Sequence, residues 1–203
     1  MTKIVSSKTF PKLFHRSTPF LDVRAPCEFS RGTFPNTTNI PILLDSEREA
    51  VGILYRREGK SAAIALGHRL VNHEAKDQLL SKWKDFIDAN PNAVLFCQRG
   101  GLRSQTAQSW LSEAGYTIPR VEGGYKSLRR HLIDSTEQLA SSDRLLLVAG
   151  KTGSGKTHFI NSLPSSLDLE GLANHRGSAF GRRVRPQPAQ ASFENALGVS
   201  IIK

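Results

Sequence analysis

The stretch that most constrains the fold is "LLLVAGKTGSGKTHFINSL", residues 145–163. An apolar run, a glycine-rich run and an amphipathic run follow one another, which predicts a buried strand, a turn and a helix. The middle run fits GxxxxGK[ST], in which glycines let amide N–H groups point at phosphate and the lysine reaches terminal phosphate oxygens. The sequence therefore predicts an anion site made by Gly150, Gly153, Gly155, Lys156 and Thr157.

A metal at this loop is less clearly indicated. The Thr157 hydroxyl can bind Mg²⁺, but the acidic partner of such a site normally ends a later apolar strand. The nearby acidic residues are Asp168 and Glu170 in "SSLDLEGLANHRG", and they read equally well as an acidic turn. A need for Mg²⁺ thus stays open, and we expect no other metal and no tightly bound cofactor.

A second motif lies in "VLFCQRGGLRSQ", where Cys97 ends an apolar run and a helix is predicted to start near Arg103. The two glycines let the backbone curl so that its N–H groups face inward, and the helix N-terminus adds positive potential. Such a cradle favours a thiolate and binds the anion that it attacks. The predicted cradle consists of Arg99, Gly100, Gly101, Arg103 and Ser104.

Two chemistries use a cysteine in this setting. A Cys-x5-Arg loop serves phosphatases, in which a thiolate attacks phosphorus and an arginine holds the phosphoryl oxygens. The alternative is transfer of sulfur or selenium through a persulfide or its selenium analogue. The spacing does not separate them. No glycine nest surrounds Cys27, which we expect to be inert.

The order of elements predicts an α/β fold. Residues 19–24, 93–97 and 116–121 read as strands, and 73–87, 103–114 and 125–134 as helices, which favours a largely parallel sheet. We expect a domain at 1–134, a polar linker at 135–143, and the start of a second α/β domain at 144–203, with a long loop and a new element beginning near residue 192.

Net charge indicates the kind of partner. The 203 residues carry a formal net charge of +10, which favours a polyanion such as RNA, although a merely solvated basic surface stays open. No run approaches the length of a membrane span and no secretion signal is evident, so we expect a cytoplasmic protein without a membrane partner. Candidate phosphate contacts are Arg129, Arg130, Arg176, Arg182, Arg183 and Arg185.

The first motif region resembles a rhodanese domain, through "FLDVRAPCEF", Gly32, Pro35, the Cys97 loop and "EGGYKSLR", although many rhodanese loops have one residue fewer between cysteine and arginine. Together with "GKTGSGKT", "DLEGLANHRGSAFG" and "QASFENALG", the chain resembles the bacterial tRNA 2-selenouridine synthases. That resemblance covers nearly the whole chain.

The resemblance implies an enzyme that geranylates wobble 2-thiouridine of tRNA from geranyl diphosphate and then replaces the S-geranyl group with selenium from selenophosphate. It implies Cys97 as the rhodanese nucleophile, Lys156 and its loop as the diphosphate site, tRNA as partner, and a selenophosphate-supplying enzyme as a further candidate partner. Full members of the family continue beyond this length, which implies a fragment, a truncated product or half of a split protein. A non-catalytic tRNA-binding protein and a standalone sulfurtransferase stay open.

Overall fold

The computed structural model describes residues 3–151, 153–177 and 181–203. These form two compact units. Unit 1 comprises the chain up to Ser30 together with Asn36–Leu128, and unit 2 comprises Arg31–Pro35 together with Arg129–Lys203. Within the described residues, no helix is both long and apolar enough to cross a membrane.

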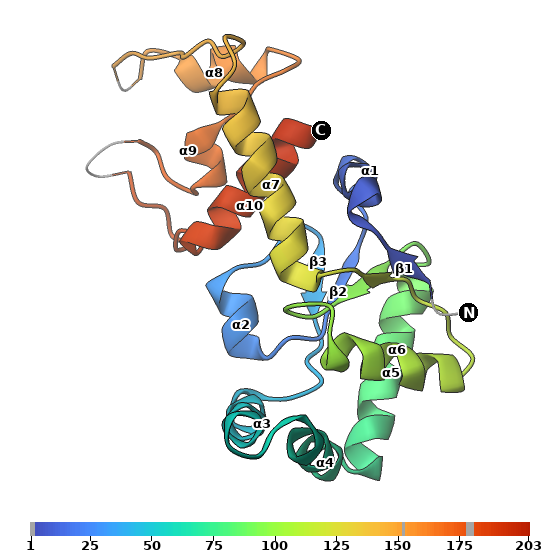
Figure 1. Cartoon of the computed structure of the whole chain (residues 1–203). Coiled ribbons are helices and arrows are strands. Elements are labelled where there is room, and N and C mark those ends of the chain that lie inside the picture. The colour runs from blue at the N-terminus through green and yellow to red at the C-terminus, as the bar shows by residue number, and fades with distance from the viewer. Residues whose placement is uncertain (1–2, 152, 178–180) are drawn as a thin grey trace. The chain divides into compact units, whose positions relative to one another are not determined.

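Unit 1 is built on a parallel five-stranded sheet, which confirms the predicted α/β class (Figure 1). The spatial order is β1-β5-β4-β2-β3. The strands are β1 (Ile4–Val5), β2 (Phe20–Asp22), β3 (Thr37–Asn39), β4 (Val94–Phe96) and β5 (Arg120–Val121). Because parallel strands share one direction, the carboxyl ends of β2 and β4 lie at the same edge of the sheet.

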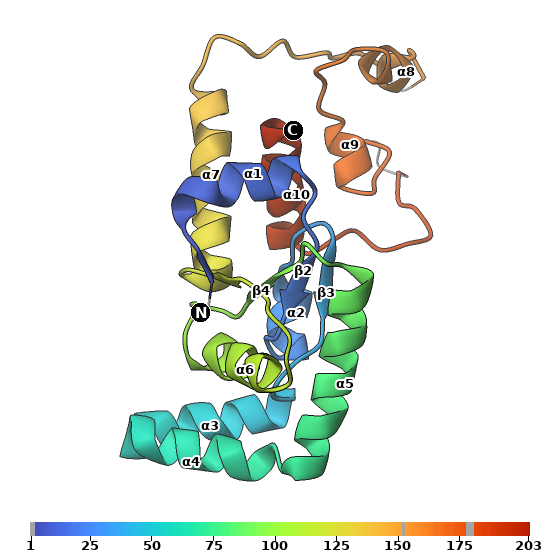
Figure 2. The same cartoon turned by 90° about the vertical axis from the view of Figure 1, so that its right-hand side faces the viewer.

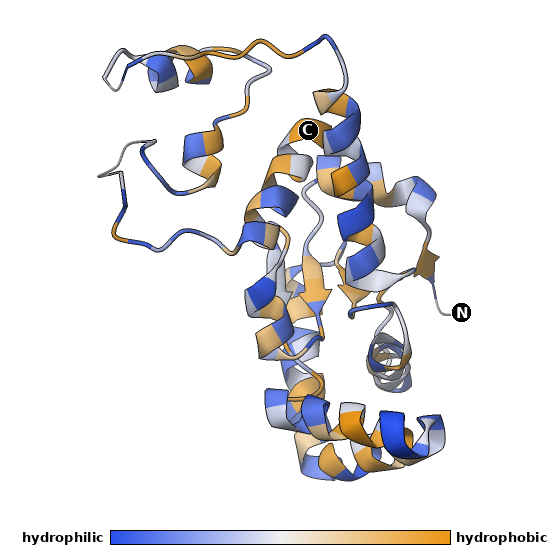
Figure 3. Ribbon diagram, turned by 60° about the vertical axis from the view of Figure 1, so that its left-hand side comes forward, coloured by the Kyte–Doolittle hydropathy of each residue, from blue (hydrophilic) through white to orange (hydrophobic). Residues whose placement is uncertain are grey.

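The central strands β2 and β4 are buried on both faces. Every residue of each is buried, and the sheet strands in Figure 3 are largely orange, the colour of hydrophobic residues. Leu21 and Leu95, which face each other in register, are fully buried. The continuous apolar run at 93–97 was therefore read correctly as a covered parallel strand, and the strand predicted at 19–24 is present as β2.

Helices surround this sheet. The predicted helices are present as α5 (His73–Ala89), α6 (Leu102–Glu113) and α7 (Gly124–Ala140). The structure adds α1 (Phe10–His15), α2 (Pro26–Arg31), α3 (Asp45–Glu58), α4 (Lys60–Leu70) and a short 3₁₀ turn at Ser7–Thr9. Helices α3 and α4 lie side by side in Figures 1 and 2. Helix α3 has no buried residue and α4 has one, Ala63. Their sequences therefore carry little of the apolar periodicity that signals a helix.

Unit 2 contains the rest of α7, α8 (Lys156–Asn161), α9 (Leu169–Leu172) and α10 (Gln190–Ile202). The new element expected near residue 192 is α10. The linker expected from residue 135 differs from the structure, because α7 continues to Ala140. Ser135 and Thr136 donate their hydroxyls to the carbonyls of His131 and Leu132, which satisfies these polar side chains within the helix.

The predicted buried strand at 145–149 is not present. Residues 145–149 are extended without a partner strand among the described residues, and Leu146 and Leu147 are 86% and 84% exposed. The same segment follows α7 as an orange stretch in Figure 3. A strand needs neighbours to bond its amides and cover its side chains, and the described part of unit 2 supplies none.

Candidate active site

Cys97 directly follows β4, at the carboxyl edge of the sheet, and precedes α6. It is 3% exposed, so its sulfur lies at the base of the loop. The Cys97 thiol donates to the Ser104 hydroxyl at 3.2 Å, and that hydroxyl donates to the Gly101 carbonyl at 3.1 Å. Ser104, a predicted cradle residue, is itself fully buried in the first turn of α6, where it contacts the sulfur directly.

Three backbone carbonyls of the loop accept hydrogen bonds from other elements. The carbonyls of Cys97 and Gln98 accept from the amides of Tyr125 and Lys126, at 2.8 and 3.1 Å, at the start of α7. The Gly100 carbonyl accepts from the Arg120 guanidinium. In the described chain, the amides from Gln98 to Gly101 find no acceptor. These N–H groups, with the first amides of α6, can therefore bind an anion.

Two glycines, one in the loop and one at the start of α7, allow this arrangement. Gly124 has φ +60°, and a Cβ there would lie 2.1 Å from the Cys97 carbonyl oxygen and 2.5 Å from the Gly100 nitrogen. Gly100 has φ +63°, and its Cβ would lie 2.8 Å from the Gly123 nitrogen. The "EGGYK" turn and the cysteine loop thus touch backbone to backbone, which only glycine permits.

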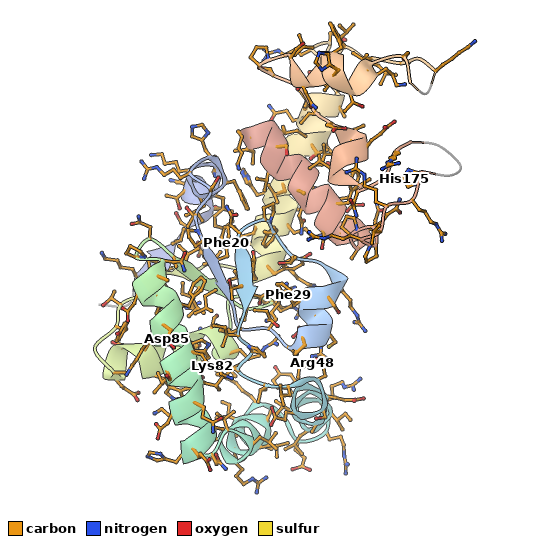
Figure 4. All side chains as sticks on the ribbon, turned by 180° about the vertical axis from the view of Figure 1, so that it is seen from behind. Phe20, Phe29, Arg48, Lys82, Asp85 and His175 are labelled. Carbon is orange, nitrogen blue, oxygen red and sulfur yellow. The ribbon has the colours of Figure 1, made fainter. Side chains whose placement is uncertain are left out.

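Arg103 does not face the loop as a free cation. Its guanidinium makes two hydrogen bonds to the Glu28 carboxylate of α2, and the Glu28 Oε2 also accepts from the Ala25 amide. Burial alone would raise the pKa of Glu28, but the bonds and charge of Arg103 hold it below its usual value. Arg48, labelled in the first turn of α3 in Figure 4, lies 4.0 Å from the same carboxylate. Arg103, a predicted cradle residue, thus forms an ion pair with Glu28.

Arg99 is the exposed cation of the loop. Among the described residues, its guanidinium has no hydrogen-bond or ion-pair partner. It is therefore available to an anion in a way that Arg103 is not.

Sequence reasoning missed a buried pair below the loop. Arg24, at the end of β2, is 1% exposed and binds the Asp22 carboxylate through Nε and Nη2, at 2.9 and 2.7 Å. Complete burial raises the pKa of the Asp22 carboxyl, and the hydrogen bonds and charge of Arg24 oppose that rise. The "DVR" run was noticed only as part of a resemblance, because alternation on a strand does not reveal that an arginine folds back on the aspartate two residues earlier.

The phosphate loop of unit 2 has the expected local geometry. Gly153 and Gly155 have φ +81° and +83°, and the helix predicted over residues 158–163 is present as α8, which starts two residues earlier at Lys156. The Lys156 ammonium donates to the carbonyls of Gly150 and Lys151 at 2.7 and 2.8 Å, so its charge lies against the loop itself. Thr157 is exposed in the first turn of α8, and Thr152 lies outside the described residues.

The acidic residues near this loop do not gather into a metal site. Asp168 is the N-cap of α9 and accepts from the Gly171 amide at 2.9 Å, so it belongs to a helix start. The described ranges contain no group of three or more His, Cys, Asp or Glu side chains that could hold a metal.

The six candidate phosphate contacts fall into two groups. Arg129 differs from the prediction, because its guanidinium is tied to Glu194, to the Asn195 Oδ1 at 2.9 Å and to the Ala191 carbonyl of α10. Arg130 pairs with Asp134 on the surface at 2.8 Å. The other four are exposed in the loop between α9 and α10, where His175 is labelled in Figure 4: Arg176, Arg182, Arg183 and Arg185.

Two family models match the chain. The rhodanese-like domain family matches residues 6–131, and the AAA domain of tRNA 2-selenouridine synthase matches residues 143–203. A protein named tRNA 2-selenouridine synthase from Shewanella sp. (strain ANA-3) is 48% identical over 202 residues, covering 100% of this chain and 55% of that protein. Its namesake from Marinobacter nauticus is 51% identical over 191 residues, covering 94% and 52%.

A solved structure is similar to about two thirds of the chain. The N-terminal domain of a putative ATP/GTP binding protein from Clostridium difficile 630 is 29% identical with a TM-score of 0.57, covering 63% of this chain and 97% of that domain. The chain spans about half the length of the curated relatives that it matches.

Proposed function

We propose that the protein containing this chain converts wobble 2-thiouridine of tRNA to 2-selenouridine. The chain belongs to the rhodanese-like domain family, and its relatives named tRNA 2-selenouridine synthase support this proposal. The proposed reaction has two steps, geranylation of the sulfur and replacement of the S-geranyl group by selenium. The observation that carries the proposal is the pairing of a cysteine loop with unbonded amides and a phosphate loop in one chain.

The phosphate loop is the proposed site of geranyl diphosphate. In the first step the thiouridine sulfur bonds to the first carbon of the geranyl chain, the carbon–oxygen bond breaks, and diphosphate leaves. Negative charge develops on the departing diphosphate, and fixed donors aimed at that charge lower the barrier. Lys156 supplies a full positive charge, and the loop amides at Gly153 and Gly155 supply aligned dipoles. We assign no step to Mg²⁺.

The cysteine loop is the proposed site of selenophosphate. The unbonded amides from Gln98 to Gly101 and the exposed Arg99 fit the oxygens of a tetrahedral anion. Binding there brings the selenium donor to the Cys97 thiolate, the nucleophile of this proposal. Its attack on phosphorus forms an S–P bond and releases hydroselenide, and water later frees phosphate from the cysteine. In the second step the bond from C2 to sulfur breaks, a bond from C2 to selenium forms, and with water consumed geranylthiol and phosphate leave.

The exposed arginines between α9 and α10 are the proposed contacts to tRNA phosphates. Four cations on one loop, Arg176, Arg182, Arg183 and Arg185, suit a backbone that carries one charge per nucleotide. Because tRNA is the substrate, we assign the reaction to the cytoplasm, and a selenophosphate-producing enzyme would supply the second step.

The test is conversion of 2-thiouridine tRNA by the protein that contains this chain, read by mass spectrometry of the released nucleosides. With geranyl diphosphate and selenophosphate present, the expected product is 2-selenouridine, and omission of selenophosphate should leave the S-geranylated nucleoside. The Cys97→Ala variant should stop at that same nucleoside. Normal selenation by Cys97→Ala would refute the role of Cys97. Salt-dependent tRNA binding without any conversion would leave a tRNA-binding protein as the answer.

A further inference from the structure

Arg24 has one guanidinium nitrogen that its buried ion pair does not use for Asp22. While Nε and Nη2 bind the Asp22 carboxylate, Nη1 donates to the Gln98 Oε1 at 3.2 Å. This bond joins the end of β2 to the residue that follows Cys97. A buried ion pair adds little net stability compared with apolar residues of the same size, so the bond to Gln98 bears more on loop geometry than on stability.

Gln98 is held by its side chain and by its backbone. Its side-chain oxygen accepts from Arg24, and its backbone carbonyl accepts from the Lys126 amide at 3.1 Å. These two contacts fix the peptide unit that begins the loop. The Gln98 carbonyl shares this peptide unit with the Arg99 amide, which finds no backbone acceptor in the described chain and thereby keeps one orientation.

Arg24 also contacts Tyr125, the residue whose amide binds the Cys97 carbonyl. Its guanidinium carbon lies 3.9 Å from the centroid of the Tyr125 ring and 5.6 Å from that of Phe96. The Tyr125 amide is the donor to the Cys97 carbonyl. A planar guanidinium can stack on a ring and bond in two directions at once, whereas a lysine ammonium cannot.

We propose that Arg24 is a positioning residue for the cysteine loop, acting through Gln98 to hold the loop amides in the orientation that binds an anion. The inference rests on the proposed role of this loop as an anion site. Arg24 itself is buried and touches no substrate. Its effect passes through the Gln98 side chain and the stacked Tyr125 ring.

The test follows alkylation of Cys97 by iodoacetamide in the full 203-residue chain, with inorganic phosphate as the probe anion. Labelled peptides are separated by mass spectrometry, so Cys27, the other of the two thiols, serves as an internal control for loosening of the fold. The variants are Gln98→Ala, Arg24→Lys and the double variant. Gln105→Ala, at an exposed position of α6, is the matched control.

Phosphate should slow alkylation of Cys97 in the parent chain. Gln98→Ala should raise by about tenfold the phosphate concentration that halves the alkylation rate, because losing a hydrogen bond to a charged group has an effect of that size. Arg24→Lys should do the same, and the double variant should be no worse than Arg24→Lys alone. The Cys27 rate and Gln105→Ala should not change. Because Gln98 is only half-buried, its variant should fold even if Arg24→Lys does not.

Unchanged protection in Gln98→Ala, additive effects in the double variant, or a matching rise in the Cys27 rate would each overturn the proposal. Absence of phosphate protection in the parent chain would also overturn it, by removing the anion cradle. The assay contains neither tRNA nor selenium. Its failure is therefore distinguishable from failure of the proposed function, which nucleoside analysis reads separately.

Discussion

Gly124→Ala tests the backbone contact on which the cysteine loop depends. The added Cβ would lie 2.1 Å from the Cys97 carbonyl oxygen and 2.5 Å from the Gly100 nitrogen, and both of these atoms are backbone. Backbone atoms cannot rotate away as a side chain can. The substitution must therefore move the start of α7 away from the loop and weaken the bond from the Tyr125 amide to the Cys97 carbonyl.

The magnitude has two parts. A non-glycine residue in the left-handed region costs about 1–2 kcal/mol, and overpacking costs about 1–3 kcal/mol. Gly124→Ala should thus lower the free energy of unfolding of unit 1 by about 4 kcal/mol, near the upper end of the sum because the clash is with backbone. Gly115→Ala is the matched control, since Gly115 has φ +83° and nothing within 4 Å of its Cβ.

The assay is urea unfolding followed by tryptophan fluorescence. Both tryptophans, Trp83 and Trp110, belong to unit 1 and stack with their ring centroids 6.3 Å apart, so the signal reports on that unit. Gly115→Ala should show only the conformational cost of about 1–2 kcal/mol. Equal losses in the two variants would refute the close contact between the "EGGYK" turn and the cysteine loop.

Three other substitutions probe the remaining contacts. Glu28→Gln should cost about 2 kcal/mol at pH 7. Because Arg103 holds the pKa of folded Glu28 below its ordinary 4.5, this difference should disappear as the pH falls through that lower value, and a pH-independent loss in urea unfolding would contradict the ion pair. Asn195→Ala removes buried bonds to the Thr33 carbonyl and to Arg129, and should speed hydrogen exchange of the α10 amides by at least about tenfold. Unchanged exchange would argue against this anchor. Lys156→Ala should weaken binding of geranyl diphosphate by about 10- to 100-fold, measured by calorimetry. The control Lys82→Ala, at an exposed position of α5, should bind geranyl diphosphate like the parent chain.

The sequence predicted the elements whose pattern is local. Residues 93–97 and 73–87 carry a continuous apolar run and a helical period, and both appear as β4 and α5. The glycine-rich turns were predicted in the same way, and Gly100, Gly153 and Gly155 have the positive φ that glycine adopts readily. The anion sites predicted at these turns stay predictions. Helix α3 was missed, because a helix that buries no side chain has no clear periodic signal.

Contacts between distant positions could not be predicted. Arg103 and Glu28 are 75 positions apart, and nothing in "CEFSRG" indicates that its glutamate pairs with the arginine of the cysteine loop. Arg129 was assigned to the surface because it belongs to a basic run, whereas Glu194 and Asn195 of α10 hold it. The predicted strand at 145–149 has the right composition, but a strand forms only against neighbouring strands, which no local pattern guarantees.

The central claim is that the two loops divide the work, with Lys156 serving geranyl transfer and Cys97 serving selenium transfer. The most direct measurement supplies tRNA that already carries S-geranyl-2-thiouridine, together with selenophosphate, and quantifies 2-selenouridine by mass spectrometry. The Lys156→Ala variant should convert this tRNA as the parent protein does, and the Cys97→Ala variant should not. Failure of Lys156→Ala on the geranylated tRNA, or conversion by Cys97→Ala, would contradict the division.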